Sequence, residues 1–574
     1  MPFRGPIEAV FEQQDEGKCD ELRGNPVRLP SGLKVEEETD FASDGEMGLF
    51  LTRMYGHRDG MFGARWRSNF DYSLEWEDRA VGIRAVRPNG SVIWMPTQAG
   101  GWRQSPAKPL PRIEQWPQGW IYLFNEAGGT EIYDQQGRVH VVRNERGVGW
   151  HYVYAGAQLQ RIDHTSGRSV RFGYTNGELT HVTDPVGSVY RYAYHRVGHH
   201  RPRLVETTLP GSPATRITYH ALPSRYIGAP PGNMSGKSFD GLRYSTFIYE
   251  RNDEEARVVS TEHHAGVERH SFAYSGDLES TTENYSVVET NPLGHRTTRR
   301  YLDGRLVSVE GAASSNCGSR DRYLQYDANG QPNQVTNFAG AVTTFDHDSA
   351  GRLIRKTEAA GTKLQRARTF TWAPDRNRVM SETLEGSAST TYTYLDNGRL
   401  ASTTVTDFAT GAIRGTTYAY TTHSNGLLSS LTVDGPTPGE DLTHQYNASG
   451  DLIESRNTAG HATRYEGHNG RGQPARIVEP SGAVTEYEYD QRGRVLVERT
   501  FPNGSPVETR YIYGASGLLD AIQAADGSSV IYHYDAARRL VQEDRTEPGG
   551  SFAVRRITYN AMSQPLRIEI GRDP

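Results

Sequence analysis

Adjacent tyrosine and aspartate residues recur along this 574-residue chain, at Tyr326-Asp327, Tyr489-Asp490 and Tyr534-Asp535 among other places. A phenol beside a carboxylate has the groups needed for general acid–base catalysis. An enzyme needs such a pair once, however, whereas a repeated fold needs a structural pair in every unit. The recurrence therefore favours a structural role, in which Tyr packs across strands and Asp caps a turn.

Two histidine groups raise the question of a metal site. They are His195, His199 and His200 in "HRVGHHRPR", and Glu262, His263 and His264 in "EHHAG". Zinc sites need ligands that converge, while successive residues of a strand point to opposite faces. The sequence also contains no GxSxG, HExxH, P-loop or CxxC motif. We predict no metal, no cofactor and no enzymatic activity.

The segment "GARWRSNFDYSLEW" combines aromatic side chains with Arg65 and Arg67. This composition occurs where proteins contact carbohydrate or nucleic acid, but a packed β core with cation–π pairs is the favoured interpretation. The net charge is −6, from 63 basic and 69 acidic residues spread evenly. No global field therefore recruits nucleic acid, and we predict no nucleic-acid partner.

The elements that position these side chains repeat. The stretch "YDQRGRVLVERTFPNG" at Tyr489 has near-copies that include "YDANGQPNQVTNFAG" at Tyr326 and "YDAARRLVQEDRTEPGG" at Tyr534. The anchors His468, Tyr489, Tyr513, Tyr534 and Tyr559 are 21, 24, 21 and 25 positions apart. Segments such as "TEYEY" and "RVLVERT" alternate with period 2, which is typical of strands. One unit is therefore a hairpin with two tight turns, and units must pair side by side because one hairpin is unstable alone.

The turn residues of these units are the site residues that the sequence singles out. Gly accepts a positive φ without a Cβ clash, and Asp caps the turn through its side chain. We assign structural turn roles to Tyr326, Asp327, Gly330, Gly351, Tyr489, Asp490, Gly493, Tyr534 and Asp535.

Composition limits the class of protein. Hydrophobic residues make up 35%, and 61 glycines and 32 tyrosines favour strands and turns. With two cysteines, Cys19 and Cys317, the chain cannot contain a framework of several disulfides, although the sequence is compatible with one disulfide between them. No apolar run reaches the ~18 residues of a membrane span, and the N-terminus has no Sec-type signal pattern. The sequence therefore predicts neither a membrane span nor a Sec-type signal peptide.

The repeat resembles that of the Rhs/YD-repeat proteins. The segments Gly24 to Phe41, Leu49 to Trp76 and Arg243 to Tyr274 are also similar to sequences of that family. The resemblance implies a β-hairpin ribbon that spirals into a hollow shell around a C-terminal toxic polypeptide, with an N-terminal plug-like domain. Other partners that it implies are a second shell-forming chain and a secretion-machinery spike protein. The resemblance further implies a protein that is made in the bacterial cytoplasm without a Sec-type signal peptide and is exported by a specialised secretion system. The family's core-associated segment and its cleavage-site aspartates have no counterpart here, so we expect a shortened protein, a half-shell or a piece of a longer chain.

We predict an all-β fold: a YD-repeat ribbon that curls into a partial hollow shell. Its parts are a flexible tail at 1–23, the plug-like β domain at 24–128 and the repeat region at 129–574, with an irregular insertion at about 221–241. The predicted function is a shell that encapsulates or delivers a toxin in interbacterial competition. A secreted or cell-surface carbohydrate-binding adhesion protein is the alternative, and a hydrolase resembling a β-propeller enzyme is disfavoured.

The last strand, "PLRIEIGRDP", alternates Leu566, Ile568 and Ile570 with Arg567 and Glu569. An array whose last hairpin has no neighbour exposes unpaired backbone groups. We therefore expect this edge to dimerise, to recruit another polypeptide or to fray.

Overall fold

The structure, a computed structural model, describes residues 22–98, 101–104, 110–223, 232–253, 255–278, 284–311, 321–548 and 552–573. Within these ranges every regular element is a strand or a single 3₁₀ turn, so the predicted all-β class is confirmed. The same ranges contain no helix long and apolar enough to cross a membrane. Cys19 and Cys317 lie outside the described residues.

Two small antiparallel sheets come first in the chain. The first contains β1 (Leu22–Arg23), β2 (Val27–Arg28) and β3 (Leu33–Lys34), and the second contains β4 (Glu36–Ala42), β5 (Phe50–Tyr55) and β6 (Trp66–Ser68).

All later strands form one long antiparallel sheet, in which each strand pairs with the next along the chain. Its first part comprises β7 (Ser73–Glu75), β8 (Gly82–Val86), β9 (Val92–Gln98), β10 (Gly101–Arg103), β11 (Arg112–Gln115), β12 (Ile121–Phe124), β13 (Thr130–Tyr133), β14 (Val139–Arg143), β15 (Gly149–Ala155), β16 (Gln158–His164), β17 (Ser169–Thr175), β18 (Glu178–Thr183), β19 (Val189–His195), β20 (Arg203–Leu209), β21 (Thr215–Ala221), β22 (Met234–Phe239), β23 (Leu242–Tyr249), β24 (Val258–His263), β25 (Val267–Ser275), β26 (Tyr285–Thr290), β27 (Arg296–Leu302) and β28 (Arg305–Gly311). The 3₁₀ turns are η2 (Pro117–Gly119) and η3 (His264–Gly266).

The second part of the sheet carries the regular repeats. It comprises β29 (Asp321–Tyr326), β30 (Pro332–Asn337), β31 (Val342–His347), β32 (Leu353–Glu358), β33 (Arg366–Trp372), β34 (Val379–Leu384), β35 (Ala388–Tyr394), β36 (Leu400–Asp407), β37 (Ile413–Thr422), β38 (Leu428–Asp434), β39 (Leu442–Tyr446), β40 (Leu452–Asn457), β41 (Ala462–Glu466), β42 (Arg476–Val478), β43 (Val484–Tyr489), β44 (Val495–Thr500), β45 (Val507–Tyr513), β46 (Leu519–Ala524), β47 (Ser529–Tyr534), β48 (Leu540–Thr546), β49 (Phe552–Tyr559) and β50 (Pro565–Asp573).

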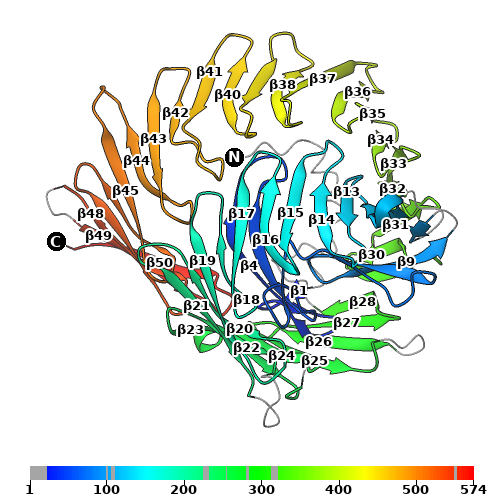
Figure 1. Cartoon of the computed structure of the whole chain (residues 1–574), viewed down its shortest axis with the longest axis horizontal. Helices are drawn as coiled ribbons and strands as arrows, with labels where there is room; N and C mark the ends of the chain where they lie inside the picture. Colours follow the sequence, from blue (N-terminus) through cyan, green and yellow to red (C-terminus); the bar gives the residue numbers. More distant parts are fainter. Residues whose placement is uncertain are drawn as a thin grey trace.

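The long sheet curls around the molecule. In Figure 1 it runs from β14–β19 near the centre through β22–β28 below and β31–β36 at the right to β40–β45 at the top and β48–β50 at the left. An isolated antiparallel bridge between Ser73 and Arg138 links the start of β7 to the residue just before β14. The residue pairs of β50 in the described chain are with β49, and Figure 1 places β50 at the left, far from β9 at the right. The later strands thus form an arc around the earlier ones.

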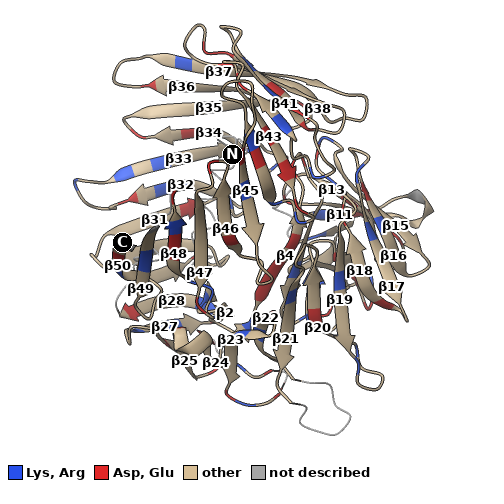
Figure 2. Ribbon diagram, turned by 90° about the vertical axis from the view of Figure 1, so that its left-hand side faces the viewer, with Lys and Arg blue, Asp and Glu red and all other residues tan. Residues whose placement is uncertain are grey.

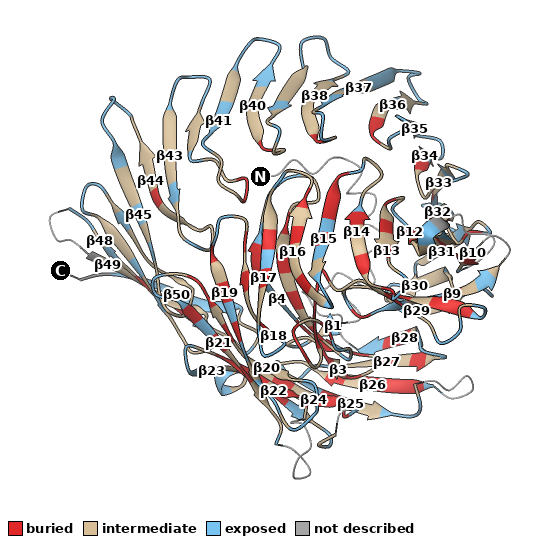
Figure 3. Ribbon diagram, viewed as in Figure 1, coloured by how far each residue is buried: buried red, intermediate tan, exposed pale blue. Residues whose placement is uncertain are grey.

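The apolar core lies in the first half of the chain. One cluster joins β4–β6 to the inward face of β7–β22, and Figure 3 shows buried residues concentrated there. Strand β19 illustrates the cause, because Tyr190 and Tyr192 are buried while Arg191 between them is exposed. Between positions 321 and 573 the described chain has few buried apolar side chains, namely Ala350, Ala367, Val379, Leu400, Leu427, Val497, Ala537 and Ile557. Over the described residues, the repeat region is therefore a sheet that buries little apolar surface.

Along the strands in the view of Figure 2, Lys and Arg residues (blue) are interspersed with Asp and Glu residues (red). This distribution agrees with the even spread of acidic and basic residues along the sequence.

The structure changes two of the boundaries expected from the sequence. The segment 221–241 is not irregular throughout, because β22 lies within it and pairs with both β21 and β23. Pro and Gly around 229–232 predicted a loop, but the residues that follow, Met234–Phe239, form a strand. Leu22–Arg23 form β1, so the predicted tail extends two residues too far, and residues 1–21 lie outside the described chain. The long sheet itself begins at Ser73, inside the range 24–128 assigned to the plug-like domain.

Candidate functional site

The repeat turns are the chemically distinctive feature of the second half of the sheet. In the turn after β43, Asp490 Oδ1 accepts hydrogen bonds from the backbone N–H groups of Arg492 (2.8 Å) and Arg494 (2.9 Å). Gly493 has φ of +81° and donates its N–H to the Asp490 carbonyl at 3.0 Å. A side chain at this φ would be strained, which explains why a glycine occupies the position.

The other predicted turn residues have equivalent places. Asp327 Oδ1 accepts from the N–H groups of residues 329 and 331, and Asp535 Oδ1 accepts from that of Arg539. Gly330 and Gly351 have φ of +80° and +78°. The structural role assigned to these residues remains a prediction that mutation can test.

The repeat tyrosines link successive hairpins. The Tyr489 hydroxyl donates to the Pro474 carbonyl at 2.8 Å, and Tyr326 and Tyr534 donate in the same way to the carbonyls of Leu306 (2.7 Å) and Leu519 (2.9 Å). Burial raises the pKa of Tyr489 to about 12. These phenols therefore stay protonated and serve as hydrogen-bond donors, which fits structure better than acid–base chemistry.

An arginine of each of these turns connects it to the next one, a role that we did not predict from the sequence. Arg494 Nε donates to Asp490 Oδ2 at 2.7 Å, and Arg494 Nη1 donates to the Gly517 carbonyl of the next turn at 3.0 Å. Its guanidinium also lies 3.9 Å from the ring centroid of Tyr513. Arg352 and Arg539 repeat this arrangement over Trp372 and Tyr559. The Gly-Arg dipeptide that follows many Tyr-Asp pairs is the sequence feature from which this role could have been predicted.

The histidine groups do not converge. His195, His199 and His200 are exposed. His263 Nε2 lies 3.3 Å from Glu268, whereas His264 Nδ1 lies 3.1 Å from the Arg243 carbonyl and Glu262 pairs with Arg269. No group of three His, Cys, Asp or Glu side chains within the described ranges is placed to hold a metal.

The aromatic and arginine-rich segment lies in the core. Trp66 is buried, and Arg67 donates to the backbone carbonyls of Asp59 (2.8 Å), Asp71 (2.6 Å) and Pro88 (3.1 Å). Arg67 therefore has little capacity left for an external ligand.

Buried ions attach the small sheets to the long one. Arg53 forms two hydrogen bonds with the Asp40 carboxylate (2.8 and 2.9 Å) and one with the Tyr219 hydroxyl (2.9 Å), and Tyr192 donates to Asp40 at 2.6 Å. Burial raises the pKa of Tyr192, so its hydroxyl keeps the proton that it donates.

A second buried group joins Glu36 of β4 to Lys237 of β22 at 2.8 Å and to Lys34 of β3 at 2.5 Å. Burial alone would raise the pKa of Glu36, but the two lysines lower it to about 2.

Later repeat turns contact the earlier part of the sheet along a row that we call the seam. Its contacts, in chain order, are Glu145 with Arg376 and Arg378, Arg168 with Asp451, Asp184 with Arg471, Thr215 with Arg492, Phe239 with Arg538, and Glu268 with Ala561. Both sides advance together along the chain. The later arc is therefore stacked on the earlier strands in a regular register.

The most deeply buried contact of the seam is Arg471 with Asp184. Their side chains are 2% and 0% exposed, and Arg471 Nε donates to Asp184 Oδ2 at 3.0 Å. Arg471 Nη2 also donates to the Gln491 carbonyl at 2.6 Å and the Tyr190 hydroxyl at 3.2 Å. Burial raises the pKa of Asp184, and Arg471 opposes that shift. Arg168 Nη2 lies 2.7 and 2.8 Å from the two Asp451 carboxylate oxygens.

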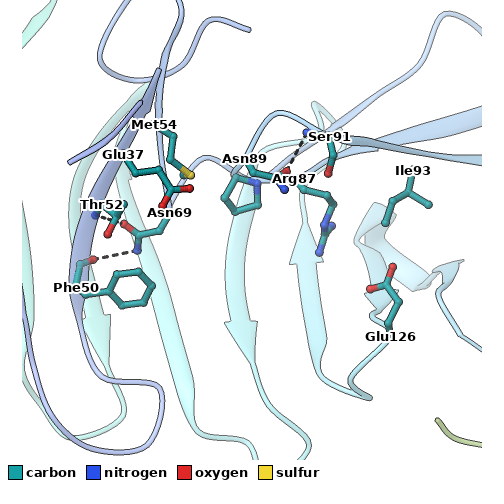
Figure 4. Close-up of a pocket in the computed structure, with 11 residues that line it drawn as sticks. Glu37, Phe50, Thr52, Met54, Asn69, Arg87, Asn89, Ser91, Ile93 and Glu126 are labelled. Carbon is teal, nitrogen blue, oxygen red and sulfur yellow. Dashed lines mark hydrogen bonds between the residues drawn. The ribbon is translucent and has the colours of Figure 1, made fainter. Parts of the chain in front are cut away.

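A cleft of about 590 Å³ separates the β4–β5 sheet from the β8–β9 hairpin. Figure 4 shows Phe50 and Met54 on one side and Ile93 on the other, with Asn69 bonded to backbone groups of Phe50 (3.0 Å) and Thr52 (2.8 Å). The cleft therefore combines apolar surface with an amide, that of Asn69, whose hydrogen bonds are to the backbone. We assign it no catalytic role.

Comparisons with known proteins connect this geometry to named families. The RHS Repeat model matches residues 326–363 and 468–506, and a domain of unknown function, DUF6531, matches residues 24–94. Double-stranded DNA deaminase toxin A of Burkholderia cenocepacia (strain H111) is 28% identical over 248 residues, which are 37% of this chain and 16% of that protein. The chain thus spans about a sixth of the length of this curated relative.

Two solved structures are similar at low scores. The structure titled TcdB2-TccC3-Cdc42 has a TM-score of 0.35 and 11% identity, over 90% of this chain and 35% of that one. The Photorhabdus luminescens Tc holotoxin pore has a TM-score of 0.36 and 14% identity, over 99% of this chain and 27% of that one.

Proposed function

Because the chain is an RHS (YD) repeat protein, we propose that it forms the wall of a shell that encloses a toxic polypeptide for interbacterial competition. The seam is the observation that carries this proposal. Its buried ion pairs hold later repeat turns against earlier strands of the same sheet, and a sheet that curls into a wall needs such contacts. The 28% identity over 248 residues to a protein named as a deaminase toxin supports the toxin connection.

The same proposal includes the partners and the route. The enclosed partner is a toxic polypeptide or a second chain that continues the wall, and a secretion-machinery spike protein delivers the assembly. The protein is secreted by a specialised system. Its own role is structural, because the tyrosines, aspartates and arginines of its turns are used in holding hairpins together.

A protection experiment tests containment. The probe is a destabilised dihydrofolate reductase fused to the C-terminus of the full chain, and the measurement is its rate of cleavage by added protease. We expect slow cleavage in the parent fusion and fast cleavage when Arg471→Ala opens the seam. The matched control is Arg464→Ala, which removes an exposed ion pair with Glu454 (3.1 Å) away from the seam. Equal cleavage in all three fusions would show that the wall encloses nothing.

A cavity favours the carbohydrate-binding alternative as a second candidate. It measures about 650 Å³, and its lining includes Trp372, Tyr392, Tyr394, Arg352 and Glu145. Aromatic rings beside polar groups suit ligands with one apolar and one polar face. Calorimetric titration with neutral and acidic oligosaccharides tests this candidate, and Tyr392→Ala should abolish any heat of binding.

A further inference from the structure

One carboxylate of the repeat sheet has tyrosines as its neighbours. Glu498 of β44 lies directly opposite Tyr487 of β43 and Thr509 of β45. These three strands lie side by side in Figure 1. The Tyr511 hydroxyl, also on β45, donates to Glu498 Oε2 at 3.2 Å. The carboxylate therefore stands between two aromatic rings that neighbouring strands supply.

Two other hairpins carry a glutamate at the position of Glu498. Glu382 and Glu543 are the fourth residues of β34 and β48, as Glu498 is of β44. All three lie opposite an aromatic residue of the preceding strand. Arg368 pairs with Glu382. Arg555 lies directly opposite Glu543 and pairs with it at 2.9 Å. An arginine from a neighbouring strand thus compensates the charge of each of the other two glutamates.

No such arginine stands beside Glu498. Thr509 occupies the place directly opposite it on β45. The adjacent Arg499 points to the other face of the sheet, where it pairs with Glu488 at 2.6 Å and with Glu508 at 2.8 Å. Within the part of the chain that the structure describes, no lysine or arginine forms an ion pair with Glu498. Its negative charge is therefore left for a cation from outside the chain.

The neighbours of Glu498 determine which cation fits. Ca²⁺ and Mg²⁺ need several oxygen ligands, and this position offers one carboxylate. A guanidinium group suits it better, because its planar fork matches a carboxylate and its face stacks on aromatic rings. Burial raises the pKa of Tyr487 and Tyr511, and the charge of Glu498 raises it further, so both rings stay neutral. Ile522, opposite Tyr511 on β46, adds apolar surface for an alkyl chain.

We propose that Glu498, Tyr487 and Tyr511 form a binding site for an alkylguanidinium group. This is the group of an arginine side chain, and free guanidinium compounds also carry it. The ligand takes the place that Arg368 and Arg555 fill in the equivalent hairpins.

Saturation-transfer difference NMR on the full chain measures the binding. One probe is butylguanidinium, and the other is N-acetyl-arginine methylamide, which carries the same group on a peptide backbone. We expect both to bind the parent chain, and butylammonium to bind more weakly because it lacks the planar fork. Tighter binding of the arginine derivative would identify a polypeptide as the source of the group, and tighter binding of butylguanidinium a free compound.

Three variants locate the site. Glu498→Gln should weaken binding of butylguanidinium by about tenfold or more, because it removes the charge from the hydrogen-bond acceptor. Tyr487→Ala should weaken it by about two- to fivefold, the size of an exposed cation–π contact. Thr509→Arg supplies an internal arginine, as Arg555 does in its own hairpin, and should abolish binding without removing any side chain of the site.

The matched control is Glu382→Gln, which makes the same change in a glutamate already paired with Arg368. It should leave the binding of both probes unchanged. A parent chain that binds neither probe would overturn the proposal, as would equal binding by the parent, Glu498→Gln and Thr509→Arg chains. The site does not rest on the proposed containment, because it binds a small probe whether or not the wall encloses a polypeptide.

Discussion

Replacing Arg471 with leucine should open the seam locally while leaving each hairpin folded. The change removes a buried guanidinium that contacts Asp184, Tyr190 and the Gln491 carbonyl. Breaking one partner of a buried ion pair costs about 3–5 kcal/mol. Asp184 keeps two backbone donors, the N–H groups of Val186 (3.0 Å) and Ser188 (2.8 Å). We therefore expect the lower end of that range.

Hydrogen exchange is the appropriate assay, because a sheet of this length need not unfold in one step. The Asp44 amide reports on the seam directly, since it donates to the Arg471 carbonyl at 2.8 Å. A loss of about 3 kcal/mol corresponds to roughly a hundredfold faster exchange there. The double variant Arg471→Leu/Asp184→Leu should recover part of the protection, because it leaves no unpaired buried charge.

Two results would refute this reasoning. Unchanged exchange at Asp44 would mean that the buried pair does not hold the seam. Faster exchange spread evenly over the repeat strands would mean that Arg471 stabilises the fold as a whole and does not act at one contact.

Three further predictions concern single side chains. Gly493→Val should destabilise the protein by about 1 kcal/mol or more, because position 493 has a positive φ. Gln491→Ser should leave the melting temperature unchanged, and equal effects of the two changes would mean that position 493 does not require glycine. Asp490→Asn keeps the acceptor for two backbone N–H groups but removes the negative charge that pairs with Arg494. Calorimetry should therefore show a loss of about 1 kcal/mol for Asp490→Asn and a larger one for Asp490→Leu; a silent leucine variant would contradict the capping role. The pKa of Glu36, about 2 in the folded chain against an ordinary 4.5, lies below its unfolded value, so its contribution to stability is present above pH 4.5 and is lost as the pH falls towards 2. Glu36→Gln should flatten that part of the pH–stability profile, and an unaltered acid limb would contradict the assigned shift.

Local signals in the sequence predicted the hairpin unit well. "TEYEY" alternates with period 2, and the following "DQRGR" contains both the turn aspartate and the glycine with positive φ. These properties depend on residues within one turn of each other, so a single copy suffices to recognise them and repetition strengthens the signal.

Contacts between distant residues could not be predicted in the same way. Asp184 and Arg471 are 287 positions apart, and neither residue differs in type from dozens of exposed charges in the chain. They meet only because the strands between them curl around the molecule and bring the later turns back to the earlier strands. The buried pair of Arg53 and Asp40 was missed for a related reason, because their neighbours Tyr192 and Tyr219 come from strands far along the chain.

The scarcity of buried apolar side chains in the repeat region explains why its turns are so polar and so constant. A sheet that buries few apolar side chains gains little stability from the hydrophobic effect, so directional contacts must fix each hairpin to the next. The Tyr489 hydroxyl bonds backwards to Pro474, and the Arg494 guanidinium stacks forwards on Tyr513. Such nearest-neighbour coupling makes the strip stable along its length, as in other repeat proteins, but it does not determine whether the strip closes. The contact between the later turns and the earlier strands therefore depends on the seam, and a change at Arg471 can weaken that contact without altering the coupling between neighbouring hairpins.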